Sequence, residues 1–196
     1  MPNEKLNNHN AKSEYDLLSP PANGRINIRQ ANPVDLKIAY KIGNAEIPGG
    51  ISAIPLVAAV IEHNSDNAYV FLHQGSIVGF YAMLMLCPCG LEQLLRGELD
   101  CAKPDLNYLT KTGEIPAAIY KWAMVAPGLA AEGILHMSKL LRTPKFKNAN
   151  FYSRPNTSAG VRINLNRGFK PVKRNTSGLY RYVRLANRIS KFEDAA

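Results

Sequence analysis

The chain has 196 residues, of which 46% are hydrophobic and 20% charged, and its formal net charge is +9. This length and composition predict one globular domain with its own core and exclude an intrinsically disordered chain. The longest apolar stretch, residues 77–87, is about half as long as a membrane-spanning helix, and the polar N-terminus has no secretory signal. We therefore expect a cytoplasmic protein that does not enter a membrane.

The three cysteines, Cys87, Cys89 and Cys101, are an odd number, which argues against a disulfide framework. The spacing of Cys87 and Cys89 does not fit a CxxC zinc knuckle, and no second cluster of Cys or His follows nearby. We therefore expect reduced thiols at the end of a strand and no metal site.

Basic residues recur from Lys139 to Lys191, and the acids that follow Lys139 are only Glu193 and Asp194. This asymmetry favours an anionic partner, which could be a nucleotide phosphate, a nucleic acid or an acidic protein. A solvated basic face is the alternative interpretation. Because no dense Lys/Arg block alternates with aromatic residues, nucleic acid is not specifically indicated.

Residues 1–24 are polar and end in a Pro- and Gly-containing stretch, which predicts a flexible tail ahead of one domain over residues 25–192. The alternating pattern of 25–31 predicts a strand, and 32–45 predicts a helix with Asn32 as N-cap and Pro33 as its first residue. A second short helix is predicted over 53–64. Two strands, 67–74 and 77–87, are predicted to form an antiparallel hairpin through Gly75 and Ser76.

Residues 88–114 are polar and irregular, and they predict an insertion that contains a short helix over 91–99. The stretch 116–126 is apolar on both faces, as in a central buried strand, and a helix follows it. A strand is then predicted over 148–154, a short helix over 156–169 that ends at Gly168, and a final strand over 178–187. This order predicts a mixed sheet covered by helices.

The order of elements over residues 25–186 resembles the GNAT superfamily of N-acetyltransferases. Two segments carry the resemblance: "MVAPGLAAEGILHMSKLL", residues 124–141, is similar to the family's acyl-CoA segment, and "NTSAGVRINLNRGF", residues 156–169, to its later helix. The resemblance implies an α/β (α+β) fold. Its central mixed sheet would have about six to seven strands, would splay between two central strands, and would carry helices on both faces.

The resemblance also implies that acetyl-CoA or another acyl-CoA is the co-substrate, with its pyrophosphate on the backbone N–H groups of the turn and the first helical turn. Ala130 stands where the family motif has Arg or Gln, and Leu135 where it has Gly or Ala. The residues that we expect to contact the cofactor are Met124, Val125, Gly128, Leu129, Ala130, Ala131, Glu132, Gly133, Ile134, Asn156, Ser158 and Arg162.

The candidate catalytic residues are Tyr120, on the central strand, and Glu92, in the insertion. Core packing is the alternative role for Tyr120, and a solvated loop carboxylate is the alternative for Glu92. The family often has a tyrosine that protonates the departing thiolate four residues before the terminal Gly of the later helix. This chain has Asn164 there, so that proton donor is missing or another group supplies the proton.

The leading hypothesis is transfer of an acetyl or other acyl group from acyl-CoA to a small-molecule or peptide amine, by direct attack in a ternary complex. An acyl carrier protein as donor is the second hypothesis, because it brings the same phosphopantetheine arm and its acidic surface suits a basic face. A non-catalytic module that binds an anionic partner such as nucleic acid is the third. A homodimer is neither favoured nor excluded.

Overall fold

The structure, a computed structural model, describes residues 26–47, 49–128, 130–172 and 178–184. Seven strands form one mixed sheet in the order β1-β2-β3-β4-β5-β7-β6. The strands are β1 Asn27–Gln30, β2 Ala68–His73, β3 Ser76–Leu86, β4 Ala118–Val125, β5 Asn150–Ser153, β6 Lys170–Pro171 and β7 Tyr180–Tyr182. Only β4 and β5 pair in parallel; every other neighbouring pair is antiparallel.

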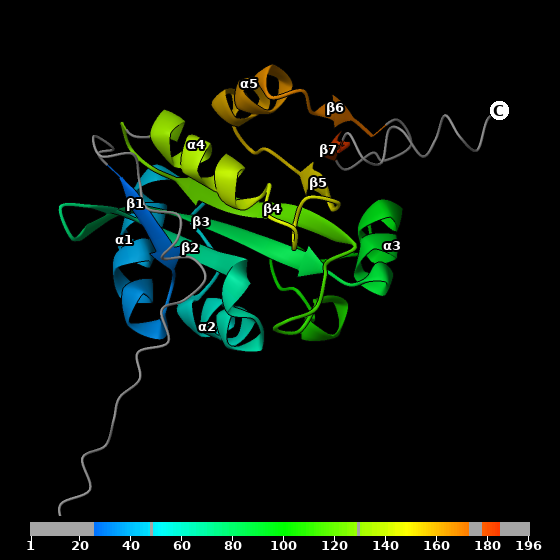
Figure 1. Cartoon of the computed structure of the whole chain (residues 1–196), viewed down its shortest axis with the longest axis horizontal. Helices are drawn as coiled ribbons and strands as arrows, with labels where there is room; N and C mark the ends of the chain where they lie inside the picture. The colour runs from blue at the N-terminus through cyan, green and yellow to red at the C-terminus, as the bar shows by residue number, and fades with distance from the viewer. Residues whose placement is uncertain (1–25, 48, 129, 173–177, 185–196) are drawn as a thin grey trace, which may run out of the picture.

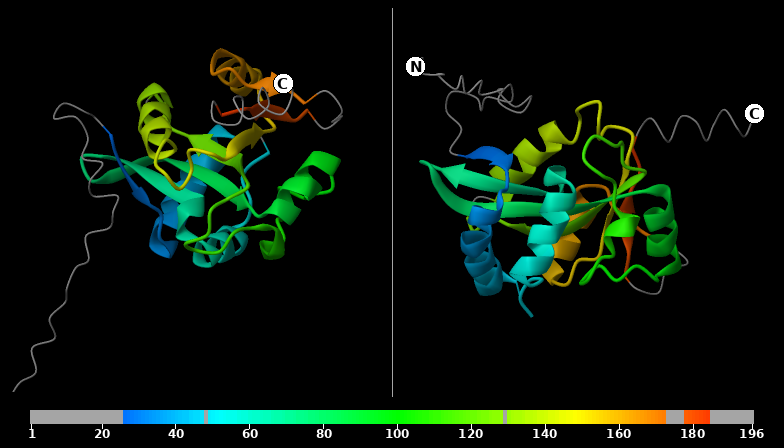
Figure 2. Two further views of the ribbon diagram at one scale, coloured as in Figure 1. Left: turned by 45° about the vertical axis from the view of Figure 1, so that its right-hand side comes forward. Right: turned by 90° about the horizontal axis from the view of Figure 1, so that it is seen from below.

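The helices lie on both faces of this sheet (Figure 1). Helices α1 (Leu36–Glu46) and α2 (Ile54–His63) cover one face, and α4 (Ala130–Leu140) and α5 (Ser158–Asn166) lie on the other. Helix α3 (Pro88–Arg96) lies beyond the end of β3, away from α1 (Figure 2). Three short 3-10 turns complete the described elements: Pro33–Asp35, Ser65–Asn67 and Leu106–Tyr108.

Three groups of buried side chains hold these layers together. Under α4, Met137 and Leu140 pack with Phe71 and Ile119 of the sheet. On the opposite face, α1 and α2 pack on another cluster, which contains Leu36, Ile61, Val70, Phe80 and Val125. The third cluster joins α3 to the sheet and contains Leu84, Leu86, Leu94, Tyr120 and Tyr152. Strand β4 therefore contributes side chains to all three groups, which is why its sequence is apolar on both faces.

The predicted mixed sheet, its strand number and the helices on both faces are confirmed. The predicted capping of the first helical segment is also present, because the Asn32 side chain accepts hydrogen bonds from the backbone N–H groups of Val34 and Asp35. The hairpin turn differs by one residue from the prediction. Gln74 and Gly75 form it, both at positive φ, because such a two-residue turn matches the twist of the strands.

Two further differences concern the ends of the chain and the cysteines. Strand β6 has only two residues and gave no periodic pattern, so the sequence did not reveal it. The predicted tail over 1–24 lies outside the described residues, as does the end of the predicted domain beyond residue 184. The structure joins Cys87 and Cys89 in a disulfide and leaves Cys101 free, so the expectation of reduced thiols is wrong for the first two.

No helix in the described ranges is both long enough and apolar enough to cross a bilayer.

Candidate functional site

The parallel pairing of β4 with β5 stops before β4 ends. The last paired residues are Lys121 of β4 and Ser153 of β5, whereas β4 continues to Val125. Beyond Lys121, one edge of β4 therefore faces no strand, and the chain leaving β5 turns away into α5. The sheet is open between its two central strands at this point, as the resemblance implies.

A β-bulge lies at the point where the strands part. Ala82 of β3 pairs with Ala123, but its neighbour Met83 pairs with Lys121, so Trp122 is an extra residue in β4. An extra residue kinks a strand and re-aims the side chains beyond it. Lys121 and Met124 accordingly line a cavity on the α4–α5 side, while Ala123 and Val125 pack towards α1 and α2.

A groove with a volume of about 770 Å³ occupies the opening. Its walls are the end of β4, the segment from Ser153 to Ile163, and the α1–α2 side of the sheet. This volume lies in the range of small-molecule and cofactor sites, about 300–1,000 Å³. Of the described residues that line it, Glu46 is the only carboxylate, and the cationic side chains are Lys121 and Arg154.

The turn between β4 and α4 contains Pro127, which lines the groove, and Gly128, whose φ is +66°. Two residues of the expected pyrophosphate segment face the sheet. Gly133 is buried against Phe71 of β2, where an added Cβ would stand 2.7 Å from a ring carbon. The Glu132 carboxylate accepts a hydrogen bond of 2.8 Å from the backbone N–H of Ile26, so it is turned away from the groove towards β1.

The start of α5 forms the facing wall of the groove. Thr157 caps this helix by accepting a 3.0 Å hydrogen bond from the N–H of Gly160. Asn156, Thr157 and Ala159 line the groove, whereas Ser158 and Arg162 are exposed and are not among its lining residues. The other end of α5 has the predicted terminal glycine, because Gly168 has a φ of +84° and follows the last helical turn.

Some of the expected cofactor residues line the groove, and others do not. Met124, Val125 and Asn156 line it, and Gly128 lies just beyond its lining. Leu129 and the side chains of Ala130, Ala131 and Ile134 lie outside the described residues. Leu135, which stands where the family motif has Gly or Ala, is exposed on α4.

No protein-family model matches the sequence, and no curated protein matches it. Solved structures do match. The loading GNATL domain of CurA from Lyngbya majuscula aligns with a TM-score of 0.55 and 13% identity, over 81% of this chain and 97% of that one. An N-acetyltransferase from Staphylococcus aureus aligns with a TM-score of 0.52 and 16% identity, over 81% and 98%. An aminoglycoside acetyltransferase in complex with coenzyme A aligns with a TM-score of 0.51 and 14% identity, over 85% and 99%.

This chain has the GNAT fold. The agreement extends over 81% to 85% of the chain in these three structures. At these identities the comparison shows the fold, and the chemistry has to be inferred from the residues around the groove.

Tyr120 lies in the wall of the groove and is buried among the side chains that pack under α3. Burial, together with the nearby Cys101 thiol, raises the pKa of its phenol far above neutral. The guanidinium of Arg154 donates to the Cys101 sulfur at 3.4 Å, beside the phenol. Tyr120 therefore keeps its proton at neutral pH, and its phenol interacts with the Cys101 thiol.

Lys121 is adjacent to Tyr120 in β4 and points to the opposite face. Its Nζ donates a hydrogen bond of 2.6 Å to Oδ1 of Asn164, the α5 residue that stands in place of the family's tyrosine. Burial lowers the pKa of Lys121 to about 8. The two residues thus form one polar unit at the place where the strands separate. The sequence signal for this pair is a single lysine in an otherwise apolar strand, which was not among the predicted site residues.

The other proposed catalytic residue, Glu92, lies on α3 with an exposed side chain 3.7 Å from Arg96 and is not among the residues that line the groove. Glu46, at the end of α1, is the carboxylate that does line it. No sequence pattern marked Glu46, because a terminal Glu on an amphipathic helix is usually a solvated residue. Within the described ranges, no three His, Cys, Asp or Glu side chains gather where they could hold a metal ion.

Proposed function

We propose that this protein transfers an acetyl or other acyl group from acyl-CoA to an amine. The observation that carries the proposal is the open edge of β4 after Lys121, which borders a groove of about 770 Å³ in a chain with the GNAT fold. An extended pantetheine arm can hydrogen-bond to such an edge as an added strand would. Coenzyme A is present in the aligned aminoglycoside acetyltransferase structure, which supports the choice of donor.

The reaction follows from placing both substrates in this groove. The amine nitrogen attacks the thioester carbon, the C–N bond forms, the C–S bond breaks, and the thiolate leaves. A cationic amine first loses one proton to solvent and then attacks; the attacking nitrogen gives up a second proton, and the thiolate takes one up. Most of the rate enhancement would come from holding the amine next to the thioester, because a fixed geometry removes the entropy cost of their encounter.

The α1–α2 side of the groove suits the amine. Glu46 gives this wall a negative charge that attracts a cationic amine, while the neighbouring lining residues Ile47, Ile51 and Ile54 are apolar. Tyr120 also lines the groove, with its phenol protonated at neutral pH. We therefore propose an amine that carries an apolar body, in a small molecule or at the end of a peptide.

Binding of the coenzyme A pyrophosphate would depend on backbone N–H groups. The turn after β4 offers N–H groups at the start of α4, where the helix dipole favours negative charge. Because the Glu132 carboxylate accepts a hydrogen bond from the N–H of Ile26, just before β1, its charge is directed away from this turn. Ala130, at the position of the motif's Arg or Gln, supplies no cation, so we expect coenzyme A to bind more weakly than in a GNAT enzyme that has the complete motif.

An acyl carrier protein is the second candidate donor, and the surface charge around α5 favours it. Basic residues are exposed along α4 and α5 and after them, and they include Lys139, Arg142, Arg162, Arg167 and Lys170. The residues of α5 include no acid. A carrier protein brings the phosphopantetheine arm without the nucleotide, so it needs no pyrophosphate site, and its acidic surface would be attracted to these cations.

A matched pair of variants on α5 tests the proposal. Ala159 lines the groove, whereas Leu165 is exposed on the same helix and does not line it. We expect Ala159→Trp to block the groove and to lower thiol release from acetyl-CoA by at least about tenfold with a panel of amines. Leu165→Trp should retain the wild-type rate.

The same variants should be assayed with an acetylated carrier protein at low and high salt. If thiol is released from the acetylated carrier protein but not from acetyl-CoA, and salt weakens this release, the carrier protein is the donor. Equal rates in both variants with both donors, or no thiol release by the wild type, would contradict acyl transfer in this groove.

A further inference from the structure

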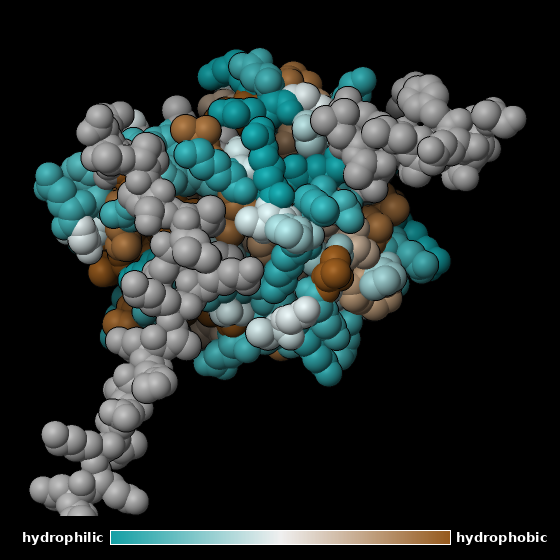
Figure 3. Space-filling model, viewed as in Figure 1, coloured by the Kyte–Doolittle hydropathy of each residue, from teal (hydrophilic) through white to brown (hydrophobic). Residues whose placement is uncertain are grey.

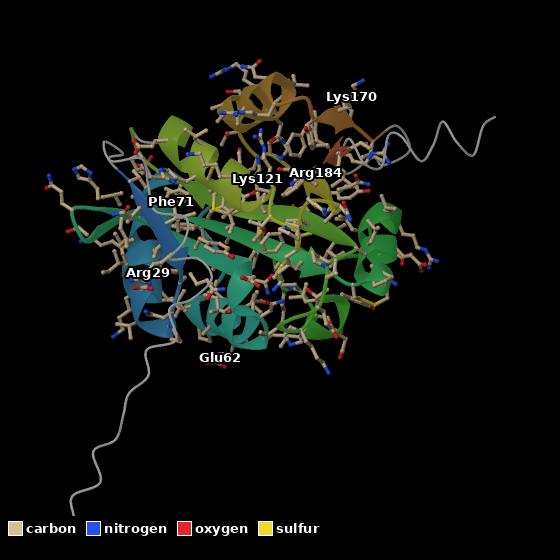
Figure 4. All side chains as sticks on the ribbon, viewed as in Figure 1. Arg29, Glu62, Phe71, Lys121, Lys170 and Arg184 are labelled. Carbon is tan, nitrogen blue, oxygen red and sulfur yellow. A yellow bond between two sulfur atoms is a disulfide. The ribbon has the colours of Figure 1, made fainter. Side chains whose placement is uncertain are left out.

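A second cavity lies behind the groove, between α4, α5 and the strands β4, β5 and β7. Its volume is about 240 Å³, the space of about eight water molecules at roughly 30 Å³ each. Arg142 and Arg167 line it and are exposed, so the cavity reaches the surface between the two helices. Figure 4 shows Lys121 and Arg184, which also line it, close together beneath α5.

The lining of this inner cavity combines positive charge with aromatic walls. None of the described residues that line it carries a carboxylate. The cations are Lys121, Arg142, Arg167 and Arg184, and the aromatic residues are Tyr81, Phe151, Phe169 and Tyr182. A positive site with apolar walls favours a ligand that has one anionic group and an apolar body.

Arg184 is already bound by the protein. Its guanidinium donates to the carbonyl oxygens of Leu141 and Ala149 at 2.6 and 3.4 Å, and it lies 4.5 Å from the ring centre of Phe151. Lys121 differs from Arg184, because its side-chain hydrogen-bond partner is the neutral amide of Asn164. No carboxylate of the described residues lies within ion-pair distance of Lys121. Its ammonium group, which lies 5.6 Å from the centre of the Phe169 ring, therefore has hydrogens left to donate and no counter-ion among the described residues.

Asn164 supplies a second donor next to this ammonium. Its Oδ1 faces Lys121, since the opposite orientation of the amide would point two N–H groups at a cation. Nδ2 is therefore the amide atom that is not bonded to Lys121, and it is a buried atom with no hydrogen-bond partner among the described residues. A buried donor without a partner is costly, so a ligand that accepts from Nδ2 would recover that free energy.

We propose that the inner cavity is a binding site for a small carboxylate with an apolar or aromatic body. One carboxylate oxygen accepts a hydrogen bond from Lys121 Nζ, and the other accepts from Asn164 Nδ2. The aromatic walls contact the body of the ligand, and the arginines add to the positive potential. Phosphate fits less well, because its larger charge and additional oxygens would face aromatic rings. The site does not depend on acyl transfer in the groove.

Binding should depend on pH through Lys121. The pKa of Lys121 is lowered to about 8 by burial, and a bound carboxylate would raise it. Affinity should therefore fall as the pH rises through 8, because the ammonium loses its proton. The ionisable groups that face Lys121 from other elements are Tyr81, Arg142, Arg167, Tyr182 and Arg184. Arginine keeps its charge over this range, and burial raises the pKa of Tyr81 far above it.

Benzoate is the probe, and benzamide is its neutral control. The protein is labelled with ¹³C at the lysine Cε atoms, and the resonance that disappears in Lys121→Met is assigned to Lys121. We expect benzoate to raise the pH at which this resonance titrates and to shift the amide signals of α5, whereas benzamide should do neither. Lys121→Met and Asn164→Leu should each weaken benzoate binding by about tenfold or more.

Lys139→Met is the matched surface control, since Lys139 is exposed on α4 and does not line the cavity. It should bind benzoate like the wild type, and Tyr182→Phe should leave the pH dependence of binding unchanged. The proposal would be overturned if neither benzoate at tens of millimolar nor succinyl-CoA moved the Lys121 resonance. It would also fail if folded Lys121→Met bound benzoate with wild-type affinity.

A carboxylate can also arrive at the end of a donor's acyl group, because Lys121, Met124 and Ile163 line both the groove and the inner cavity. Comparing succinyl-CoA with acetyl-CoA tests whether the carboxylate comes from the donor's acyl group. This comparison rests on the proposed function. A shift of the Lys121 resonance with succinyl-CoA alone assigns the carboxylate to the donor, and a shift with benzoate assigns it to a separate molecule. Both results support the carboxylate site, and the absence of both contradicts it.

Discussion

Lys121 forms no ion pair with a carboxylate of the described residues. Its hydrogen bond to Asn164 gives the ammonium one neutral partner, and burial makes the charged form costly. A lysine in this position does not arise from packing needs, since a methionine would fill the same space without that cost. This cost is consistent with a role in binding.

Lys121→Met provides a stability test of this residue. The pKa of Lys121 is about 8 in the fold against 10.5 for an ordinary lysine, so the unfolded chain binds more protons between these values. Stability therefore rises with pH in that window. We expect the wild type to gain about 2 kcal/mol relative to Lys121→Met between pH 7 and pH 10. Urea unfolding at several pH values measures it, and a constant difference between the two proteins would contradict the burial of this charge.

At the scale of elements, the docking of α4 on the sheet decides where the turn after β4 lies. Gly133 allows this close approach, because Phe71 of β2 fills the space that a side chain would need. Gly79 of β3 plays a similar part at the end of β4, where an added Cβ would stand 2.3 Å from the carbonyl oxygen of Val125. Both glycines help to position the walls of the groove, although neither lines it.

Gly133→Ala tests the docking of α4. Alanine normally favours a helix over glycine, but here its Cβ would stand 2.7 Å from the Phe71 ring. We expect a loss of about 1–3 kcal/mol in the free energy of unfolding, because overpacking forces the helix or the ring to move. Chemical denaturation measures the loss, with Lys139→Ala on the exposed face of α4 as control. A variant as stable as the wild type would show that α4 does not pack closely at this point.

The pattern of the sequence was sufficient for the mixed sheet and its helices, apart from the two-residue strand β6, but only partly for the site. Periodicity, capping residues and turn glycines are local signals, and they placed β4, α4, α5 and Gly168 correctly. The role of Gly133 was not readable, because a glycine that approaches a phosphate and a glycine that approaches a phenylalanine look alike in a sequence. Lys121 and Glu46 reach the groove through the bulge at Trp122 and through the packing of α1, which depend on contacts between distant segments.

At the scale of the whole molecule, the two faces of the sheet carry different chemistry. The α1–α2 side lines the groove with apolar residues and with the carboxylate of Glu46, whereas the α4–α5 side carries exposed cations. On the face shown in Figure 3, hydrophilic residues cover much of the surface, and the hydrophobic ones lie in separate small groups. Such an arrangement suits a neutral or cationic acceptor on one side and an anionic donor on the other.

The central claim is that the open edge of β4 holds an acyl-pantetheine arm. Titration of ¹⁵N-labelled protein with acetyl-CoA, followed through assigned amide signals, tests it most directly. We expect the largest shifts at residues 122–125 of β4 and 156–160 of α5, which saturate below millimolar ligand, with Leu165→Trp unchanged and Ala159→Trp unresponsive. The open edge of β4 does not hold the arm if the signals of these two segments do not move at millimolar acetyl-CoA. The same conclusion follows if the shifts fall on α3 and the far edge of the sheet instead.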